Sequence, residues 1–419
     1  MSLSRSQFEI VTDPDAFRAL QSEWDALWSR AHGRYHQAFA VCWLCWRISA
    51  QPRGRQLHCI VCREQGKLVM VWPLVTYRFL FWTLLRPLGP DTADHTSILV
   101  DEQIGNAAIT EDTWRALTRS CGAHVCDLPY VSVGSRLYDI ADKHPRTIVS
   151  ERADAAIAKL RGETDWQAFC ATLGTLSGRK PGARERRLSK EGKLVVRMLS
   201  AQDTGDFAAW VDWLLARKRE WIDRAGKRGD WLHSLAYRDL LVDMLDPPAG
   251  DAMARLFVVT LDGVPLAASV VGIGESCVTG LIAAFDQRYS KYSPISIVIE
   301  HCVKWALEQG KDLDFGVGSE SFKAYWSRDN ITLTCSFRIA LNRWGWVAIH
   351  THETARRLKS RATRWYATLR RIQTQTGRRF EPLVQSSAVF LGRLCGLTRS
   401  PLKQWPHHAP LHDDHRVKR

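Results

Sequence analysis

Three consecutive apolar runs constrain the fold more than any other part of this 419-residue sequence. They are Arg255 to Leu261, Val264 to Ile273 and Ser276 to Phe285. Asp262 and Gly263 separate the first two runs, and Asp-Gly between apolar runs is typical of a two-residue β-hairpin turn. The sequence therefore predicts three antiparallel strands joined by short turns.

A helix and a further strand are predicted directly after these strands. Ser293 is a residue type that favours the N-cap, and Pro294 suits the first helical position because no amide donor is needed there. Gly310 is a suitable C-terminal stop, and Lys311 to Phe315 is predicted to be a short strand. Apolar residues recur at helical spacing between these ends, at Ile297, Val298, Cys302, Trp305 and Ala306.

The rest of the pattern predicts an α/β (α+β) protein with two domains and a tail. Before residue 160, helices are expected over Asp13–Ala31, His36–Ile48 and Glu111–Ser120, and strands over Gln56–Arg63, Leu68–Phe79 and His124–Leu128. Beyond it, helices are expected over Thr164–Lys190, Asp206–Arg224 and Leu232–Leu245, and strands over Leu194–Met198 and Thr332–Leu341. We therefore divide the chain into residues 1–160, 161–350 and 351–419.

Residues between Ser293 and Trp326 form a pattern known from one family. It combines a Ser293-Pro294 helix start, the strand end Asp314-Phe315-Gly316-Val317-Gly318, and Glu320 followed by Phe322-Lys323 and Trp326. This pattern resembles the cellulose-biosynthesis (CelD-like) acetyltransferase family of the GNAT superfamily, which is related to the FemAB-type aminoacyl transferases. The family usually has glycine or another small residue after the proline, where this chain has Ile295. A weaker likeness extends from Phe8 to Ala340.

The resemblance implies tandem GNAT-like domains, with the acyltransferase site in residues 161–350. It implies acyl-CoA as a cosubstrate, no bound cofactor, and a small-molecule or saccharide acceptor that offers an amine or a hydroxyl. A role in exopolysaccharide or cellulose biosynthesis follows only from this likeness. Two other functions stay open, namely FemAB-like transfer from aminoacyl-tRNA and non-catalytic scaffolding of a membrane polysaccharide synthase.

The start of the helix at Ser293 is a candidate anion site. Its first backbone amides have no partner within a helix, and the helix dipole favours a negative charge there. In the GNAT superfamily this position holds the pyrophosphate of coenzyme A, although the usual glycine-rich loop is absent here. A plainly capped helix without a ligand is the alternative. The candidate donor-binding residues are Arg288, Lys291, Ser293, Ile295 and Ser296.

A second group of candidates could act on the acceptor. Asp314, at a strand end beside glycines, and Glu320 are candidate bases or acceptor-orienting groups. FemAB-type enzymes have a Phe-Lys pair that contacts a substrate phosphate, so the resemblance gives Lys323 that role. The alternative is an Asp314–Lys323 ion pair that fixes the turn. Tyr289 is a candidate general acid.

Two cysteine pairs, Cys42/Cys45 and Cys59/Cys62, have a spacing similar to that of zinc ribbons. A structural zinc needs four ligands that converge tetrahedrally. The first pair lies in an apolar, Trp-rich helix, and the second lies three apart on a strand, where side chains point to opposite faces. We therefore expect buried core cysteines and no metal.

Most of the net charge of +14 lies near the C-terminus. Residues 351–419 hold 15 Lys and Arg against 4 Asp and Glu, whereas the preceding residues are almost neutral. Apolar residues repeat through the basic segment at Leu358, Ala362, Trp365, Leu369 and Ile372. We therefore expect a basic amphipathic helix that binds an anionic membrane surface or a partner helix, with a helix packed on the body as the alternative, and no nucleic acid partner for the body.

The N-terminus lacks an apolar signal region, and the most apolar window, Leu68 to Leu85, is interrupted by Pro73 and Arg78. We therefore expect a cytoplasmic protein, with the tail placing it at the inner face of the membrane.

Overall fold

A computed structural model describes residues 7–90, 95–101, 107–199, 206–226, 229–247, 250–354 and residue 361. The expected basic amphipathic helix over Leu358 to Ile372 lies outside these residues, apart from Arg361. The described chain is a mixed α/β fold, as the sequence predicts, with one four-stranded and one 11-stranded sheet. Within these residues, no helix combines the length and the apolar character needed to cross a membrane.

The three predicted antiparallel strands are confirmed as β11 (Ala254–Leu261), β12 (Val264–Ile273) and β13 (Cys277–Phe285). Helix α10 (Pro294–Glu308) then crosses back, so that β14 (Asp312–Val317) pairs with β13 in parallel. This order follows from connection length, because two parallel neighbours need a crossover that is long enough to hold a helix.

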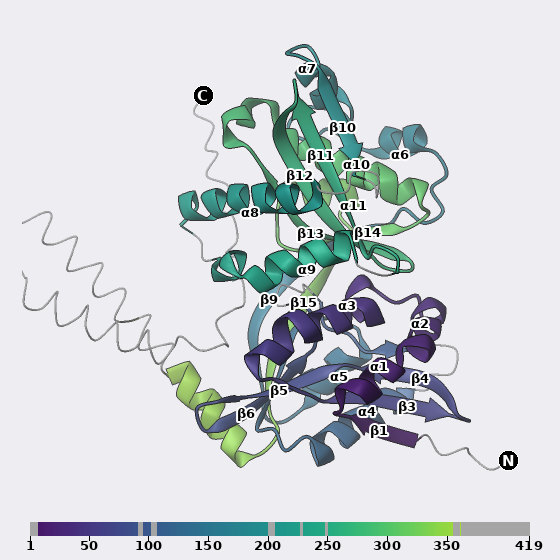
Figure 1. Ribbon diagram of the computed structural model, residues 1–419, viewed down its shortest axis with the longest axis vertical. Coiled ribbons are helices and arrows are strands. Elements are labelled where there is room, and N and C mark those ends of the chain that lie inside the picture. Colours follow the sequence, from purple (N-terminus) through teal and green to yellow (C-terminus); the bar gives the residue numbers. More distant parts are fainter. Residues whose placement is uncertain are drawn as a thin grey trace, which may run out of the picture.

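Alternating side chains of β11 face two different helical layers. Leu256 and Val258 pack with residues of α8 (Asp206–Arg224) and α9 (Leu235–Leu245), which lie across one face of the sheet (Figure 1). Phe257 and Val259 pack with α10 on the other face. The first of these clusters also contains N-terminal residues such as Phe17, so one hydrophobic core joins the two halves of the chain.

The large sheet runs through both halves because each half contributes one strand that pairs with strands of the other half. We call this arrangement the exchange of strands. β9 (Thr147–Ala158) pairs with β14 on one side, and β15 (Ile331–Ala340) lies between β9 and β8 (Val125–Ser132). The full order is β10-β11-β12-β13-β14-β9-β15-β8-β6-β5-β2, with β10 (Leu194–Met198) at one edge (Figure 1). β15 was predicted as a strand, whereas β9, the longest strand of the described chain, was not.

The N-terminal half contributes the other end of this sheet and a small sheet of its own. The small sheet comprises β1 (Gln7–Val11), β3 (Cys59–Glu64), β4 (Lys67–Trp72) and β7 (Leu99–Val100). The large sheet takes β2 (Gln56–Leu57), β5 (Leu74–Phe79) and β6 (Trp82–Pro87). The strand predicted over Leu68–Phe79 is therefore two strands in different sheets, because Pro73 cannot donate to a ladder.

Helices of this half are α1 (Pro14–Ala19), α2 (Gln21–Arg30), α3 (Phe39–Leu44), α4 (Ala107–Ser120) and α5 (Arg136–Lys143), with a π-helix over Cys45–Ala50. Two further helices, α6 (Trp166–Thr172) and α7 (Ala183–Leu188), replace the single helix predicted over Thr164–Lys190. The residues between α6 and α7 are not helical, since Gly174, Gly178, Pro181 and Gly182 interrupt them.

The four cysteines with zinc-ribbon spacing are buried in the apolar core, as the sequence predicts. Cys42 and Cys59 belong to one cluster and Cys62 to another. In the described ranges, no group of three or more His, Cys, Asp or Glu side chains is arranged to hold a metal ion.

Candidate functional site

A wedge opens between strands β13 and β14. The two strands pair in parallel at Cys277 with Asp312, Val278 with Leu313, and Thr279 with Asp314. Beyond this point they have no further paired residues in the described chain, and a cavity of about 310 Å³ lies between them.

The divergence has a local cause in both strands. β13 continues along β12 to Phe285, and a register shift between Val270 and Val271 bends that pair. β14 turns instead towards β9, and Gly316 there has a φ of 68° that glycine adopts without steric cost. Backbone groups of β13 on the cavity side therefore lack a strand partner, and they can bond to an extended ligand.

The cavity walls combine apolar side chains with a few polar ones, as in small-molecule sites. Leu281, Ile282 and Ile299 are among the apolar lining residues. The polar side chains that reach the cavity are Lys218, Ser269, Gln287, Glu320 and Lys323. Lys218, from α8, lies 4.6 Å from the ring of Trp221 and donates to the Ala283 carbonyl at 3.3 Å.

The start of α10 borders this cavity through Ile295. Ser293 has a φ of 53°, which is unusual for a residue other than glycine, and its side chain makes no capping bond. The Ser296 amide donates to the Ser293 carbonyl at 2.9 Å, so that amide already has a partner. The anion site expected here stays a prediction, and the Ser296 amide is not available to it unless its bond to the Ser293 carbonyl opens.

The basic candidates near this helix start already have partners. Arg288 forms an ion pair with Asp286 at 2.6 Å, and its side chain is 75% exposed. The Lys291 ammonium lies 4.6 Å from the ring centroid of Tyr292. Tyr289 packs against the apolar cluster around α10 and is not among the residues that line the cavity. The structure therefore brings Ile295 to the cavity and leaves Tyr289 outside its lining.

Lys323 and Glu320 lie together on the cavity wall, after the end of β14. Lys323 Nζ donates to the carbonyls of Val317 at 2.6 Å and Gly316 at 3.3 Å, and it lies 3.1 Å from Glu320 Oε2. Gly318 has a φ of 135°, a conformation that residues with a side chain rarely adopt, and an added Cβ there would contact the Glu320 carboxylate and the Lys323 ammonium. The charge of Lys323 is therefore compensated by Glu320, and its ammonium group donates to two backbone carbonyls.

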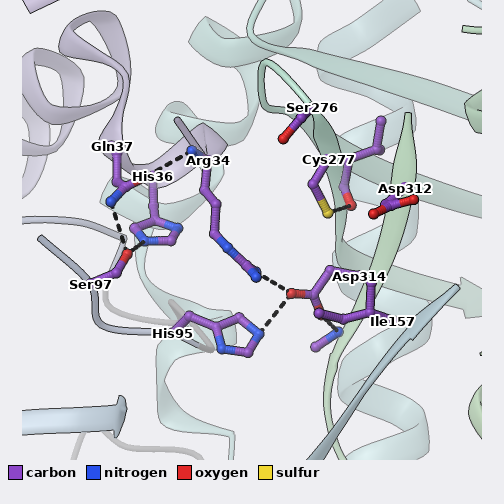
Figure 2. Close-up of polar contacts among 12 residues, drawn as sticks. Arg34, His36, Gln37, His95, Ser97, Ile157, Ser276, Cys277, Asp312 and Asp314 are labelled. Atoms are coloured by element: carbon purple, nitrogen blue, oxygen red, sulfur yellow. Dashed lines mark hydrogen bonds and ion pairs between the residues drawn. The ribbon is translucent and has the colours of Figure 1, made fainter. Parts of the chain in front are cut away.

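Asp314 faces away from the cavity and is fully buried. Arg34 Nη1 donates to Asp314 Oδ2 at 2.5 Å, and His95 Nε2 lies 2.8 Å from the same oxygen (Figure 2). The Gly316 amide donates to Asp314 Oδ1 at 2.8 Å. The alternative of an Asp314–Lys323 ion pair is therefore wrong, because Lys323 pairs with Glu320 and Asp314 with Arg34.

The pKa of Asp314 is set by these opposing influences. Burial raises it, but the charge and contact of His95, the charge of Arg34 and the Gly316 amide together hold the pKa well below its usual range. A carboxylate with such a low pKa and no access to the cavity is a poor proton acceptor. The role of Asp314 as a general base stays a prediction, and its burial away from the cavity favours an architectural role.

A polar cluster continues from Asp314 into the N-terminal half. His36 Nε2 lies 3.2 Å from Ser97 Oγ, and Gln37 donates to the same oxygen at 2.9 Å (Figure 2). Burial, together with the charges of Arg34 and His95, lowers the pKa of His36 to about 3 against a smaller opposing effect of Asp314. A small cavity of about 30 Å³ lies beside these residues.

Sequence reasoning missed Arg34 and His95 because they lie far from Asp314 in the chain. Only the packing of the N-terminal half against the C-terminal half brings these residues together. It also missed Lys218, Trp221 and Gln287, whose place on the cavity wall depends on the packing of α8 and on the end of β13.

Comparison with known proteins identifies the fold family that the C-terminal half resembles. Residues 179–324 match the sequence profile of the family described as "Acetyltransferase (GNAT) domain". No curated protein matches the sequence. The specific CelD-like family stays a prediction.

Several solved structures resemble the chain to different degrees. One is described as the crystal structure of FemX, with a TM-score of 0.56 and 14% identity over 82% of this chain and 99% of that one. Another is a tandem GNAT protein from the clavulanic acid biosynthesis pathway, with a TM-score of 0.45 and 11% identity over 81% of this chain and 99% of that one. A third is L-PGS from Bacillus licheniformis, with a TM-score of 0.44 and 12% identity over 79% and 93%. The likeness to FemX shows a shared fold over both halves of the chain.

Proposed function

We propose that the protein is a GNAT-type acyltransferase that binds an acyl-CoA thioester in the wedge between β13 and β14. The observation that carries this proposal is the divergence after Thr279 and Asp314, with a cavity of about 310 Å³ beside the start of α10. A thioester on an extended, amide-containing arm suits such a wedge, because unpaired backbone groups can bond to it as a strand would.

The reaction follows from what surrounds the wedge. The acceptor nitrogen or oxygen attacks the thioester carbonyl carbon and gives up one proton, the carbon–sulfur bond breaks, and the coenzyme leaves as a thiolate that takes up a proton from the protonated base or from water. Unpaired amides of β13 are suited to polarise the carbonyl oxygen while negative charge develops on it. Glu320 is the carboxylate on the cavity wall, so we assign it, rather than Asp314, the role of accepting the proton directly or through water.

We assign Lys323 two tasks at this site. It fixes the turn after β14 through the carbonyls of Gly316 and Val317, and it holds the Glu320 carboxylate in place through a 3.1 Å ion pair. Binding of an acceptor phosphate at Lys323 requires one of these contacts to open. The acceptor is an amine or a hydroxyl, and the proposed setting in polysaccharide biosynthesis comes from the sequence resemblance alone.

Calorimetric titration with acetyl-CoA, longer acyl-CoAs and free CoA tests the donor. Binding of one of these by the wild-type chain, lost in Gly280→Leu, is the expected result, because Gly280 lines the cavity and has room for a Cβ. The matched control is Gly174→Leu, since Gly174 lies outside the cavity lining with nothing within 4 Å of an added Cβ. Absence of binding to all three ligands would contradict the proposal.

Aminoacyl-tRNA is the second candidate donor, and one local observation favours it. Arg187 of α7 donates to the Lys291 carbonyl at 3.4 Å and lies 5.4 Å from the Tyr292 ring centroid, so a basic segment borders the start of α10. Cationic side chains there would suit the phosphates of an RNA end. Transfer assays with both donor types separate the two candidates, and failure with both would favour a non-catalytic scaffold.

A further inference from the structure

An apolar surface lies at the far end of the N-terminal half, away from the wedge. The described chain exposes 11 large apolar side chains, and five of them fall in two short segments, the turn between β5 and β6 and the helix over residues 343–354. Four of these five, Leu80, Phe81, Trp344 and Val347, together with Trp82, whose ring contacts that of Trp344, are named the aromatic patch.

The turn of the hairpin carries the most exposed part of the patch. Phe79 pairs with Trp82, so Leu80 and Phe81 form the tip, where they are 58% and 73% exposed. Leu80 has a φ of 53°, a conformation that bulky side chains rarely adopt. Glycine or asparagine would suit this turn better, and neither Leu80 nor Phe81 gains burial from its position. Folding therefore gives no reason for two large apolar residues at this tip.

The helix over residues 343–354 joins the turn to form one surface. Ala348 and Ile349 are buried against Tyr77 and Leu84, which fixes one side of this helix to the body. Trp344 lies 5.8 Å from Trp82, ring centroid to ring centroid, and is 48% exposed. Val347, one turn further on, is 44% exposed. In Figure 1 this yellow-green helix lies beside β6.

Positive charge surrounds the patch and follows it in the sequence. Arg78 and Arg343 flank its two segments, both are exposed, and neither has an ion-pair partner among the residues that the structure describes. The same helix leads directly into residues 355–419, and residues 351–419 hold 15 Lys and Arg against 4 Asp and Glu.

From this arrangement we infer that the aromatic patch inserts into the headgroup region of an anionic lipid bilayer. A protruding turn with Leu and Phe, supported by two Trp rings and bordered by Arg, matches the composition of surfaces that sit at the water–lipid boundary. The charge of the flanking Arg residues and of the sequence that follows is complementary to anionic headgroups. The inference concerns the folded body, and it is independent of the proposed acyl transfer.

The full chain tests it by sedimentation with vesicles of phosphatidylglycerol and phosphatidylcholine in equal parts, and of phosphatidylcholine alone. We expect binding to the anionic vesicles only, and Phe81→Ser should weaken it by about tenfold or more, since the apolar ring then no longer enters the lipid. The matched control is Leu235→Ser, because Leu235 is 75% exposed but lies outside the patch, on α9. It should bind as the wild type does.

Two results would overturn the inference. The wild-type chain could fail to bind anionic vesicles, or Phe81→Ser could bind them as well as the wild type. If Phe81→Ser keeps its vesicle binding and changes its oligomeric state, as seen by analytical ultracentrifugation, the patch contacts a second copy of the chain instead. Trp344→Ser provides a second reading, and its vesicle binding should weaken in the same direction as that of Phe81→Ser.

Discussion

Arg34 Nη1 donates to Asp314 Oδ2 at 2.5 Å across 280 positions of sequence, and this contact connects the two halves of the protein beside the wedge. The carboxylate is fully buried, and His95 approaches the same oxygen. The pair therefore fixes the middle of β14 relative to the N-terminal half.

Asp314→Asn should lower the free energy of unfolding by about 3 kcal/mol, because it leaves a buried cationic group without its counter-charge. Urea unfolding at neutral pH measures this change. Glu163→Gln is the control, since the ion pair of Glu163 with Arg328 is partly exposed and its loss should change stability by less than about 1 kcal/mol. Equal losses in the two variants would contradict the structural role of Asp314.

The stability of the protein should fall in mild acid because of His36. Its folded pKa of about 3 lies below the ordinary value near 6.5, so the unfolded chain binds a proton that the folded chain refuses. Stability from this group is fully present above about pH 6.5 and falls as the pH drops towards about 3.

Between pH 7 and pH 5 this effect is about 2 kcal/mol for the wild type. His36→Gln cannot titrate, so its stability should depend less on pH by about that amount over the same interval. Urea unfolding at both pH values gives the comparison. Identical pH dependence in the two proteins would show that His36 is accessible to protons in the fold.

Lys323→Met should destabilise the fold and not only the site. The substitution leaves the carbonyls of Gly316 and Val317 and the Glu320 carboxylate without their donor, which should cost about 2–4 kcal/mol. We expect turnover per folded molecule to fall at least about tenfold, with unchanged donor affinity. Normal turnover of the folded fraction would limit Lys323 to architecture.

Glu320→Gln provides the complementary experiment, because it keeps the size of the side chain. If Glu320 accepts the proton, kcat should fall by about 100-fold or more while donor affinity stays the same. Steady-state kinetics and calorimetry measure the two quantities. A fall in donor affinity with unchanged kcat would place Glu320 in donor binding.

Ser296→Asp tests the start of α10 as the site of the donor phosphates. A carboxylate in the first turn suits the helix dipole, so the melting temperature should change little, whereas CoA affinity should fall by about tenfold or more. Calorimetry with free CoA measures this, and Ser290→Asp in the preceding turn is a nearby comparison. Unchanged CoA affinity in Ser296→Asp would place the phosphates elsewhere.

The sequence predicts those parts of the fold in which local pattern and tertiary environment agree. The hairpin at Asp262-Gly263 and helix α8 are local features, and they formed as expected. β9 was missed because its sequence, with Glu151, Arg152, Asp154 and several Ala, lacks the β-branched alternation of a strand. Only its place between β14 and β15 makes it one.

In the candidate site, too, contacts between residues close in sequence could be predicted, and contacts between distant segments could not. Glu320 and Lys323 are close in sequence, so their association in one turn was open to sequence reasoning. The environment of Asp314 was not, because Arg34 and His95 reach it from distant segments. Nor could the sequence place the cavity, which depends on the point at which two strands diverge.

The exchange of strands has a consequence for biosynthesis. Tyr130 of β8 donates its amide to the Ser336 hydroxyl of β15, 206 positions later, and β15 fills the space between β8 and β9. At about 5–20 residues per second, the ribosome needs roughly 10–40 s to add that length of chain. During that interval the nascent N-terminal half has two strand edges without their shared neighbour. It can complete its sheet only after β15 has left the exit tunnel, so the first half to be made is not the first to finish folding.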